Sequence, residues 1–445
     1  MVSEGGIGLT EKYFEIRDPI HGLIRYNDLE REIINSPAFQ RLRRIRQLAW
    51  TDYVYPGAMH TRFEHSIGVM HVAGRLFDRL TSDIRSREIL RSEFQVSDAD
   101  VDRFRQYVRL AALCHDLGHG PFSHAAEDLF PRKSDGKGRI PHETFSFEII
   151  KSEIAPIVKS HATSNELGLN TDGVASFIDG VPTDGITALF KDLVSGTLDA
   201  DRMDYLLRDA YHCGVRYGQY DLERIINTIG VCEDFDEAGE FRIGINDDGI
   251  HAAEGLVIAR FMMFTQVYMH KTRSIYDYHF ENCMKTLLVK KGGQFPDPFT
   301  KKSLLEFMQW DDWRVLGLIQ SGEGGEHAKI IMERMHHRLV CETLESYEDE
   351  GKTDRAHKRF EKIKKEINKL GGIELPASKS WYSQKTGSDI LVRDANSDSL
   401  IGRPLSERSS LVKSLRTVNQ RRLYVPYDKA DSARQVVEKM QQSGG

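Results

Sequence analysis

The sequence is poor in cysteine and contains no paired cysteine motif. Its 445 residues include five cysteines, and no two of them form a C-x-x-C pair. An odd, scattered set argues against a disulfide framework and against a cysteine zinc site, and it suits reduced thiols. We therefore expect a cytoplasmic location, with these residues as free thiols: Cys114, Cys213, Cys232, Cys283 and Cys341.

Long apolar runs and an excess of basic charge are also missing. No stretch approaches the roughly 18 apolar residues that span a bilayer. The first residues, MVSEGGIGLTEKYFEIRD, lack the basic-then-apolar order of a signal peptide. The net charge is -6, which argues against a chain built mainly to coat nucleic acid. We expect no membrane partner and do not favour a nucleic-acid partner, although this charge is compatible with a local cationic pocket for a polyphosphate.

The residues that are present indicate a globular protein with a large helical part. The chain is 29% charged and 40% hydrophobic, which is ordinary for such proteins. Its length suits one large domain with an appendage. Most of residues 1–340 have helical character. Val108–His115 is a nearly continuous apolar run, as expected of a buried helix, and Ala253–His270 predicts a second strongly apolar helix.

Turn residues divide this helical part. Gly118, Gly120 and Pro121 end the first apolar helix, and PFSHAAEDLF predicts a new helix with Pro121 in its opening turn. Residues 229–245 predict a small hairpin, because VCEDF and EFRIGI have strand composition and DEAG supplies turn residues.

Residues 341–445 differ from the rest in composition and pattern, and they predict a small lobe. Glu348–Lys369 is a charged segment with helical spacing, which usually forms a solvated helix face. Beyond Gly371 and Gly372, DILVRD and RRLYVPY predict two strands, and ADSARQVVEKM predicts a final helix. The expected fold class is therefore mainly α, with a helical core over residues 1–340 and a small C-terminal α+β lobe over residues 341–445.

Two histidines and two aspartates are the candidate metal ligands. His115 and Asp116 are adjacent in an otherwise apolar helix, where an unpartnered ionised carboxylate would be costly. A metal ion removes that cost because it neutralises the carboxylate and takes the imidazole nitrogen as a ligand. His65 in TRFEHSIGV and Asp201 in TLDADRMDYLLRD each stand at the head of a helical pattern. This mixed nitrogen and oxygen set suits Fe, Mn, Co, Ni or Zn.

A purely structural interpretation of these residues has to be weighed. An isolated His-Asp pair is usually a surface or capping feature. The segment LCHDLGHGPFSH, however, places three histidines and one aspartate within twelve residues. If these residues were only structural, His115, His119 and His124 would have to be accommodated on two helices and their turn with no function for any of them. We therefore favour a metal site.

The motifs resemble those of the dNTP triphosphohydrolases of the HD-domain superfamily. The superfamily pattern is a histidine, then His-Asp, then a distant aspartate. The closer match consists of DPIHG, FQRLRRIRQL, TRFEHSIGV, HDLGHGPFSH and DADRMDYLLRD, which occur here in the order of that family. The resemblance covers roughly residues 14–280 and returns in RRLYVPYDKADSARQVVEKM. It implies that the helical core is an HD domain and that the protein is a homo-oligomer, either a dimer or a tetramer.

The resemblance assigns roles to individual residues. His65, His115, Asp116 and Asp201 would bind a divalent metal ion, whose identity among Mn, Fe, Mg, Co, Ni and Zn stays open. Positions around the phosphates are matched by Arg62, His119, His124, His142 and Arg202. Of these, His124 is the first candidate for the acid that protonates the departing 5′-oxygen, and His119 and His142 are further catalytic candidates. Sugar contacts are matched by Gln47, Leu48, Tyr205 and Asp209, with Tyr205 leaving no room for a 2′-hydroxyl.

Elementary chemistry supports the phosphate residues independently. A triphosphate needs cations, which arginines supply permanently and histidines supply in a tunable way. For single arginines, ordinary surface charge is the usual interpretation. Arg62 and Arg202 each lie within three residues of a proposed ligand, which favours a function. Gln47 and Tyr205 taken singly are equally compatible with structural roles.

The family pattern also includes a site for a nucleotide activator near DPIHG and FQRLR. Arg43 fits the arginine expected there, but Asn35 stands in place of an acidic residue that reads guanine, and Phe14 in place of a lysine. An amide cannot accept from both guanine N1–H and N2–H₂ as a carboxylate can. We therefore expect either constitutive activity or an activator other than guanine. Asp18 belongs to the same candidate set, and Asp18 and His21 are equally compatible with turn and packing roles.

These observations predict a metal-dependent deoxynucleoside triphosphate triphosphohydrolase that releases deoxynucleoside and intact triphosphate. One alternative is an HD-type phosphodiesterase or nucleotidase acting on mononucleotides, cyclic dinucleotides or oligonucleotide ends. Such an enzyme has less need of several cations beside the His-Asp pair. The other alternative is a non-catalytic HD scaffold that senses nucleotides or binds nucleic acid, which the four intact metal positions disfavour.

Overall fold

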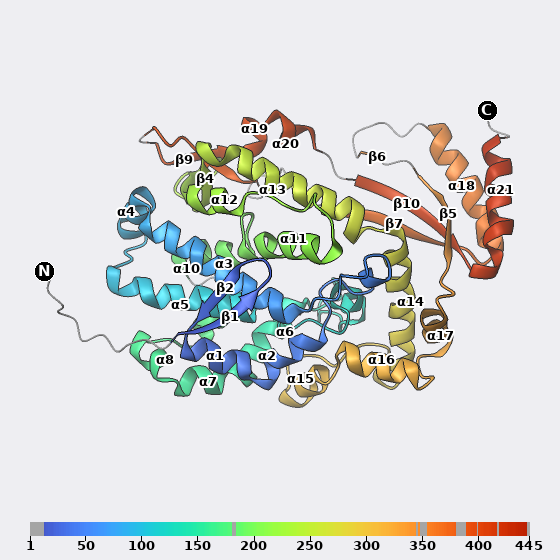
Figure 1. Cartoon of the computed structure of the whole chain (residues 1–445), viewed down its shortest axis with the longest axis horizontal. Helices are drawn as coiled ribbons and strands as arrows, with labels where there is room; N and C mark the ends of the chain where they lie inside the picture. Colours follow the sequence, from blue (N-terminus) through green and yellow to red (C-terminus); the bar gives the residue numbers. More distant parts are fainter. Residues whose placement is uncertain are drawn as a thin grey trace, which may run out of the picture.

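Helices that cross the interior form the body of the chain (Figure 1). The computed structural model describes residues 13–179, 184–343, 346–347, 354–379, 389–397, 399–415 and 418–442. Within these ranges the strands are short and form small sheets. The predicted class, mainly α with a C-terminal α+β lobe, is confirmed. Among the described residues, no helix has the length and apolar character that crossing a bilayer needs.

Three packed helices build the framework of the core. Helix α3 (Arg62–Ser82) lies against α5 (Asp98–Cys114) and α11 (Ala200–Cys213). A capping box of Thr61 and Glu64 starts α3, and the Asp199 side chain accepts the Arg202 N–H at the start of α11. The last turns of α5 are buried on all sides, as the apolar run there predicts. These caps fix where each helix begins, and so they fix where its first side chains point.

The segment after α5 differs from the prediction. PFSHAAEDLF was predicted to form a helix with Pro121 in its opening turn; the helix found there is a 3₁₀-helix, η3 (Ser123–Leu129), and Pro121 lies in the turn before it. Phe122 and Ser123 have φ values of 58° and 54°, in the left-handed region, which no α-helix accommodates. The Phe122 N–H is bonded instead to Asp312 Oδ1 at 2.7 Å. A contact almost two hundred residues away therefore overrides the local helix signal.

The second apolar helix is confirmed with changed limits. The predicted span, Ala253–His270, corresponds to α13 (Ile250–Met263) followed by a π-helical turn, η6 (Phe264–Tyr268). The wider turn re-aims the side chains after Met263, and one of them, Tyr268, reaches the site described below.

Two hairpins flank the helical core. The N-terminal one pairs β1 (Phe14–Asp18) with β2 (Gly22–Tyr26), with Asp18 opposite Gly22. Gly22 has a φ of 76°, which glycine adopts without strain. The predicted hairpin at 229–245 is confirmed as β3 (Ile229–Asp234) and β4 (Phe241–Asn246).

Strands from the predicted C-terminal lobe divide between two sheets. The DILVRD strand is β8 (Leu391–Arg393), which pairs with β4 and with β9 (Ile401–Pro404), and the four strands β3, β4, β8 and β9 close into a small barrel. Arg393 is buried there and bonds to Asn246 and Asp83. The pairing therefore crosses the predicted boundary between residues 340 and 341, which itself stays a prediction.

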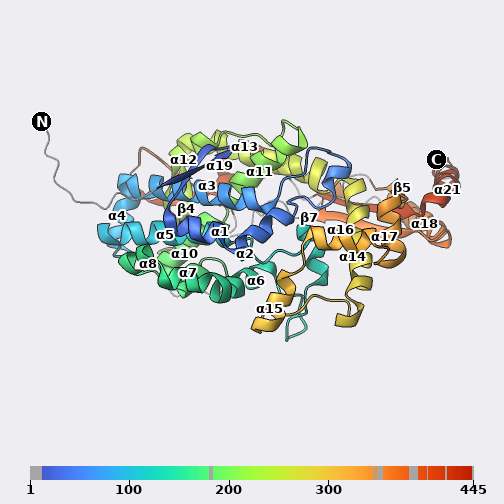
Figure 2. The same cartoon turned by 60° about the horizontal axis from the view of Figure 1, so that its bottom comes forward.

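The remainder of the lobe forms its own small core beyond α14 (Lys271–Leu287) and α17 (Gly325–Glu333) (Figures 1 and 2). Strand β10 (Val418–Val425) pairs with β5 (Arg338–Glu342), β6 (Ser346–Tyr347) and β7 (Ile373–Lys379). Helices α18 (Asp354–Lys369) and α21 (Ala430–Gln442) pack on this sheet through a shared apolar cluster. The predicted charged helix is confirmed from Asp354 onward, and its first residues, 348–353, lie outside the described residues.

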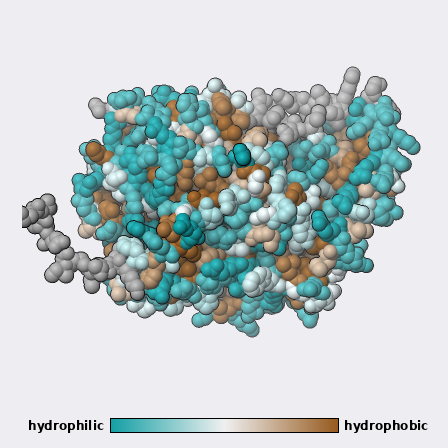
Figure 3. Space-filling model, in the orientation of Figure 1, coloured by the Kyte–Doolittle hydropathy of each residue, from teal (hydrophilic) through white to brown (hydrophobic). Residues whose placement is uncertain are grey.

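The remaining helices cover the core. The face drawn in Figure 3 is mostly hydrophilic, with apolar side chains in scattered patches. The helices that cover the core are α1 (Asp28–Asn35), α2 (Pro37–Gln40), α4 (Ile84–Ser92), α6 (His142–Ile149), α7 (Ala155–Ser160), α8 (Ala162–Leu167), α9 (Thr171–Ser176), α10 (Gly185–Ser195), α12 (Leu222–Thr228), α15 (Lys301–Met308), α16 (Asp312–Gln320), α19 (Leu405–Arg408) and α20 (Ser410–Ser414).

Candidate metal centre and catalytic site

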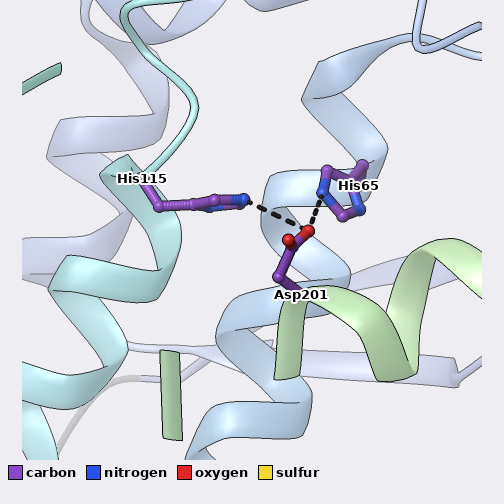
Figure 4. A group of neighbouring side chains, drawn as sticks. All are labelled: His65, His115 and Asp201. Atoms are coloured by element: carbon purple, nitrogen blue, oxygen red, sulfur yellow. Dashed lines mark ion pairs between the residues drawn. The ribbon is translucent and has the colours of Figure 1, made fainter. Parts of the chain in front are cut away.

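Three of the predicted metal ligands converge from three helices (Figure 4). His65 lies in the first turn of α3, His115 caps the end of α5, and Asp201 lies in the first turn of α11. The Nε2 atoms of His65 and His115 lie 3.0 Å and 3.7 Å from Asp201 Oδ1. Ligand atoms held about 2.1 Å from one ion are themselves roughly 3 to 3.5 Å apart, so the spacing suits a shared cation.

Asp116, the fourth predicted ligand, closes the group. One of its oxygens lies 3.3 Å from His115 Nε2 and the other lies 3.5 Å from His65 Nε2. Its side chain is 3% exposed, whereas that of Asp201 is 35% exposed. The group is thus buried on the Asp116 side and open on the Asp201 side, where a substrate can approach.

The orientation of both histidine rings fits metal binding. His65 Nδ1 donates to Asp204 Oδ2 at 2.8 Å, and His115 Nδ1 donates to the Ala112 carbonyl at 2.7 Å. In each ring the other nitrogen, Nε2, is buried and makes no hydrogen bond within the part of the chain that the structure describes. A ring whose Nδ1 donates to a carboxylate or carbonyl directs its Nε2 atom at the ligand group, the orientation that metal-ligating histidines have.

The electrostatics of the group favour a cation. Burial disfavours a charged His65 ring, yet Asp201, Asp204 and Asp116 together raise the pKa of His65 to about 10. The field of these carboxylates is therefore strong enough to hold a positive charge at a buried position. A divalent metal ion held by His65, His115, Asp116 and Asp201 would satisfy that field, and the two-nitrogen, two-oxygen set suits Mn, Fe, Co, Ni or Zn.

Arg62 lies directly beside this group, at the first position of α3. Its Nη1 donates to Asp116 Oδ2 at 2.5 Å and its Nε donates to Ser123 Oγ at 2.8 Å. Its third nitrogen, Nη2, is buried and has no hydrogen-bond partner among the described residues. A guanidinium that is fixed on two sides and free on the third can bind a phosphate oxygen.

The three predicted catalytic histidines are brought together with an acidic residue that was not predicted. His119 lies 3.2 Å from Asp116 Oδ1, and its ring stacks on that of His142 with centroids 3.8 Å apart. Glu127 Oε1 accepts from His124 Nδ1 at 2.7 Å and from His142 Nδ1 at 3.1 Å. Glu127 follows His124 by three residues, so the i, i+3 spacing in SHAAE was the available signal.

The three histidines differ in their tendency to carry a proton. Burial and Arg62 hold the pKa of His119 well below its usual range, so this ring is neutral. Desolvation also lowers the pKa of His124, against the opposing effect of Glu127. Burial disfavours a charged His142 as well, but Glu127 and Glu143 raise the pKa of His142 overall. His142 is therefore the ring best placed to hold a proton at neutral pH.

Arg202, the other predicted phosphate ligand, is held by backbone. Its Nη1 donates to the carbonyls of Gly196 and Thr197, and lies 3.5 Å from Asp199 Oδ2. Arg202 follows Asp201 in the first turn of α11, but its guanidinium bonds to the loop before the helix.

The predicted sugar residues occupy one face of α11 and the chain before α3. Tyr205 and Asp209 follow Asp201 at intervals of four, so the three side chains lie along one helix face. Asp209 accepts from His60 Nε2 at 2.7 Å and from the Tyr268 hydroxyl at 2.6 Å. His60 and Tyr268 were not predicted, because their contacts join segments far apart in the sequence.

Gln47 and Leu48 are both buried, at 7% and 6% exposure. Gln47 Oε1 has no hydrogen-bond partner among the described residues, although its backbone N–H donates to the His60 carbonyl at 3.0 Å. A buried amide oxygen without a protein partner can accept a hydrogen bond from a water or from a ligand group.

The residues of the candidate activator site are not equally accessible. Asp18 is buried and accepts from Arg208 Nη1 at 2.7 Å, whereas Asn35 and Arg43 are exposed. Arg43 lies over the Phe63 ring at 3.4 Å, and Phe14 stacks on Tyr26 in the β1–β2 hairpin. Asp18 thus makes an internal contact, and its part in an activator site stays a prediction.

Two protein-family models and several known proteins match this chain. The family model described as "HD domain" matches residues 62–182, and the model described as "HD associated region" matches residues 220–442. The chain is 33% identical over 333 residues to an uncharacterised protein of Methanocaldococcus jannaschii, covering 75% of this chain and 59% of that protein. It is 32% identical over 281 residues to the deoxynucleoside triphosphate triphosphohydrolase SAMHD1 of Homo sapiens, covering 59% of this chain and 42% of that protein.

A solved structure of a hypothetical protein from Aquifex aeolicus matches with a TM-score of 0.73 and 29% identity, covering 96% of this chain and 100% of that chain. The two family models together cover both the ligand-bearing helices and the C-terminal sheets. The matched region spans about half the length of several curated relatives, including 51% of a Dictyostelium discoideum homologue of SAMHD1.

Proposed function

Because this chain belongs to the HD-domain family that includes the dNTP triphosphohydrolases, we propose that it is a metal-dependent phosphohydrolase that cleaves dNTPs to deoxynucleoside and intact triphosphate. One observation carries the proposal. Asp116 joins a four-residue metal-ligand group to Arg62, whose free Nη2 is available to a phosphate. Metal and phosphate would therefore meet at a single buried carboxylate.

In this proposal His65, His115, Asp116 and Asp201 hold a divalent cation. Such an ion supplies Lewis-acid activation of the phosphate and of the attacking water. The protein's own contribution is to fix the two imidazole rings through Asp204 and the Ala112 carbonyl. Because these partners are part of the folded core, the ligand geometry is set before any metal or substrate binds.

Arg62 would bind an oxygen of the α- or β-phosphate through Nη2. Water would attack the α-phosphorus and form a new P–O bond, losing a proton to solvent, while the bond between phosphorus and the 5′-oxygen breaks and the 5′-oxygen takes a proton from a histidine. His142 and His124 both donate from Nδ1 to Glu127, so a protonated ring of either residue carries its transferable proton on Nε2. The raised pKa of His142 supports that residue as the proton carrier at neutral pH, while His124, which is half exposed, remains the candidate that contacts the leaving oxygen.

Tyr205, Asp209, Gln47 and Leu48 would form the sugar side. Asp209 is held by His60 and Tyr268, which leaves its remaining lone pairs for a sugar hydroxyl. Tyr205 lies between Asp201 and Asp209 on α11, so a sugar stacked on it would lie within reach of the metal ligands. Arg202, Asn35 and Arg43 stay predictions for phosphate and activator binding, as does assembly into a dimer or tetramer.

The proposal is tested by product analysis. The purified protein is incubated with each of the four dNTPs and the four NTPs in Mn²⁺, with and without a second nucleotide, and the products are separated by ion-exchange chromatography. Deoxynucleoside with inorganic triphosphate supports the proposal. Nucleoside monophosphate with pyrophosphate, or no loss of any dNTP, overturns it and favours the phosphodiesterase or scaffold alternatives.

A further inference from the structure

Asp204 links a metal ligand to the N-terminal hairpin. It lies three residues after Asp201 on α11 and is fully buried. Its Oδ2 accepts from His65 Nδ1 at 2.8 Å, and its Oδ1 lies 2.7 Å from His21 Nε2, in the turn between β1 and β2. Since an ionised carboxylate only accepts, both histidines donate to it.

We propose that the turn of the β1–β2 hairpin is part of the metal centre, with His21 and Arg208 fixing Asp204 so that Asp204 holds His65 in its metal-binding orientation. The inference rests on the proposed metal site. It gives His21 and Asp204 the role of positioning residues, because neither has to contact metal or substrate.

Arg208 completes the cage around Asp204. Its Nε and Nη2 each donate to a different Asp204 oxygen at 2.8 Å, and its Nη1 donates to Asp18 Oδ2 at 2.7 Å. The other Asp18 oxygen, Oδ1, accepts from the N–H groups of Ile20 and His21 at 2.8 Å and 2.9 Å, which closes the hairpin turn. The same arginine thus ties Asp204 to the carboxylate that shapes the turn carrying His21.

The backbone of α3 is adapted to this contact. A Cβ at Gly68, one turn beyond His65, would lie 1.9 Å from Asp204 Oδ1 and 2.4 Å from Arg208 Nη2. Neither group has room to withdraw, because both are fully buried and engaged on their other sides. Only glycine at residue 68 lets the carboxylate approach His65 so closely.

The contact with Asp204 determines which nitrogen of His65 faces the proposed metal site. His65 Nδ1–H points at Asp204, so Nε2 faces Asp116 and Asp201. If the carboxylate moved or lost its charge, the ring would be free to rotate or to place its proton on Nε2, where it blocks a ligand position. Loss of such an outer partner typically weakens metal affinity about 10- to 100-fold.

The fold offers a matched control. His60 donates to Asp209 at 2.7 Å, with side-chain exposures of 0% and 2%, and so repeats the His21–Asp204 pair on the same helix α11. Asp209, unlike Asp204, has no hydrogen bond to a proposed metal ligand among the described residues. His60→Phe removes an equally buried histidine without touching the orientation of His65.

The experiment compares the wild type, His21→Phe, Asp204→Asn and His60→Phe as metal-free full-length proteins. Mn²⁺ affinity is measured by calorimetry, and the visible absorption of bound Co²⁺ reports the coordination geometry. We expect Mn²⁺ binding about 10-fold weaker in His21→Phe and up to about 100-fold weaker in Asp204→Asn, with an altered Co²⁺ spectrum in both. His60→Phe should keep wild-type affinity and spectrum.

Wild-type affinity and an unchanged spectrum in His21→Phe overturn the inference, as does an equal loss in His60→Phe. Circular dichroism identifies a variant that fails to fold, and because His21→Phe leaves the Asp204–Arg208 pair in place, it keeps the test decisive if Asp204→Asn does not fold. If the wild type itself binds neither ion, the proposed function fails instead, so the two failures are distinguishable.

Discussion

Arg62 Nη1 lies 2.5 Å from Asp116 Oδ2, and both side chains are almost completely buried. The arginine therefore neutralises part of a carboxylate that also serves the proposed metal centre. Arg62 and Asp116 stand at the start of α3 and just after the end of α5, so the packing of two core helices fixes their distance. Any change at Arg62 should consequently affect substrate binding and the metal centre together.

The first prediction concerns Arg62→Lys. An ammonium group cannot donate to Asp116, Ser123 and a phosphate in the fixed planar arrangement that the guanidinium provides. We expect kcat/KM for dNTPs to fall about 100-fold, which corresponds to the loss of a charge-assisted phosphate contact of about 2 to 3 kcal/mol. Arg75→Lys, on the surface of the same helix, should leave steady-state kinetics unchanged. Wild-type kinetics in Arg62→Lys would show that Nη2 does not bind substrate.

The second prediction concerns Asp201→Asn. The amide keeps the size of the side chain but lacks the charge that a divalent ion requires from this position. Because the Asp201 side chain is 35% exposed, the fold should tolerate the change. We expect loss of bound metal, measured by elemental mass spectrometry, and loss of dNTP turnover by at least about 1000-fold, with an unchanged circular dichroism spectrum. Retained turnover would remove Asp201 from the ligand set.

The third prediction concerns Glu127→Gln. The Glu127 carboxylate stabilises protonated His124 and His142, so removing its charge lowers the pKa of both rings. Because the proposed acid must be protonated, the alkaline limb of the kcat profile should move to lower pH by about one unit, and kcat at pH 7.5 should fall about 10-fold. Asp128→Asn, which neutralises an exposed neighbouring carboxylate, should leave the profile in place. An unshifted alkaline limb in Glu127→Gln would exclude this pair from proton donation.

The sequence singles out the candidate metal ligands because each lies in a local pattern, and their binding of a metal stays a prediction. The His115–Asp116 pair ends an apolar helix, and His65 and Asp201 follow helix caps that Thr61 and Asp199 provide nearby in the chain. Helix starts are set by such short-range contacts, so the direction of the first side chains is encoded locally.

Residues whose role depends on a distant partner escaped prediction. Asp204 is an ordinary helical residue until the N-terminal hairpin brings His21 to it across 183 positions. The left-handed Phe122 depends on Asp312, and β8 acquires its partner β4 only in the folded chain. Periodicity and caps carry no information on such pairings, and the 3₁₀ form of the helix at Ser123 was not predicted for that reason.

A last prediction concerns stability against acid, and it rests on a buried histidine between α14 and α17. His279 is fully buried, its Nδ1 lies 2.9 Å from His327 Nδ1, and its Nε2 accepts the backbone N–H of His337 at 3.3 Å. The neutral ring satisfies both contacts by donating from Nδ1. A second proton would have to sit on Nε2, where it meets the His337 N–H. Burial and the neighbouring His337 and His327 lower the pKa of His279 to about 3.

The sign of the pH dependence follows from this depressed pKa. In the unfolded chain the pKa of His279 is about 6.5, so between pH 6.5 and about 3 the unfolded state binds a proton that the folded state refuses. The free energy of unfolding should therefore be highest above pH 6.5 and fall by up to about 1.4 kcal/mol per pH unit below it.

His279→Gln should be less stable at pH 7.5, because the packing is disturbed, yet lose less stability on acidification. Urea unfolding at pH 7.5, 6.0 and 5.0 measures both effects, with His251→Gln, whose side chain is 95% exposed, as the control that keeps the wild-type slope. Equal slopes in wild type and His279→Gln would mean that the acid sensitivity of the fold originates elsewhere.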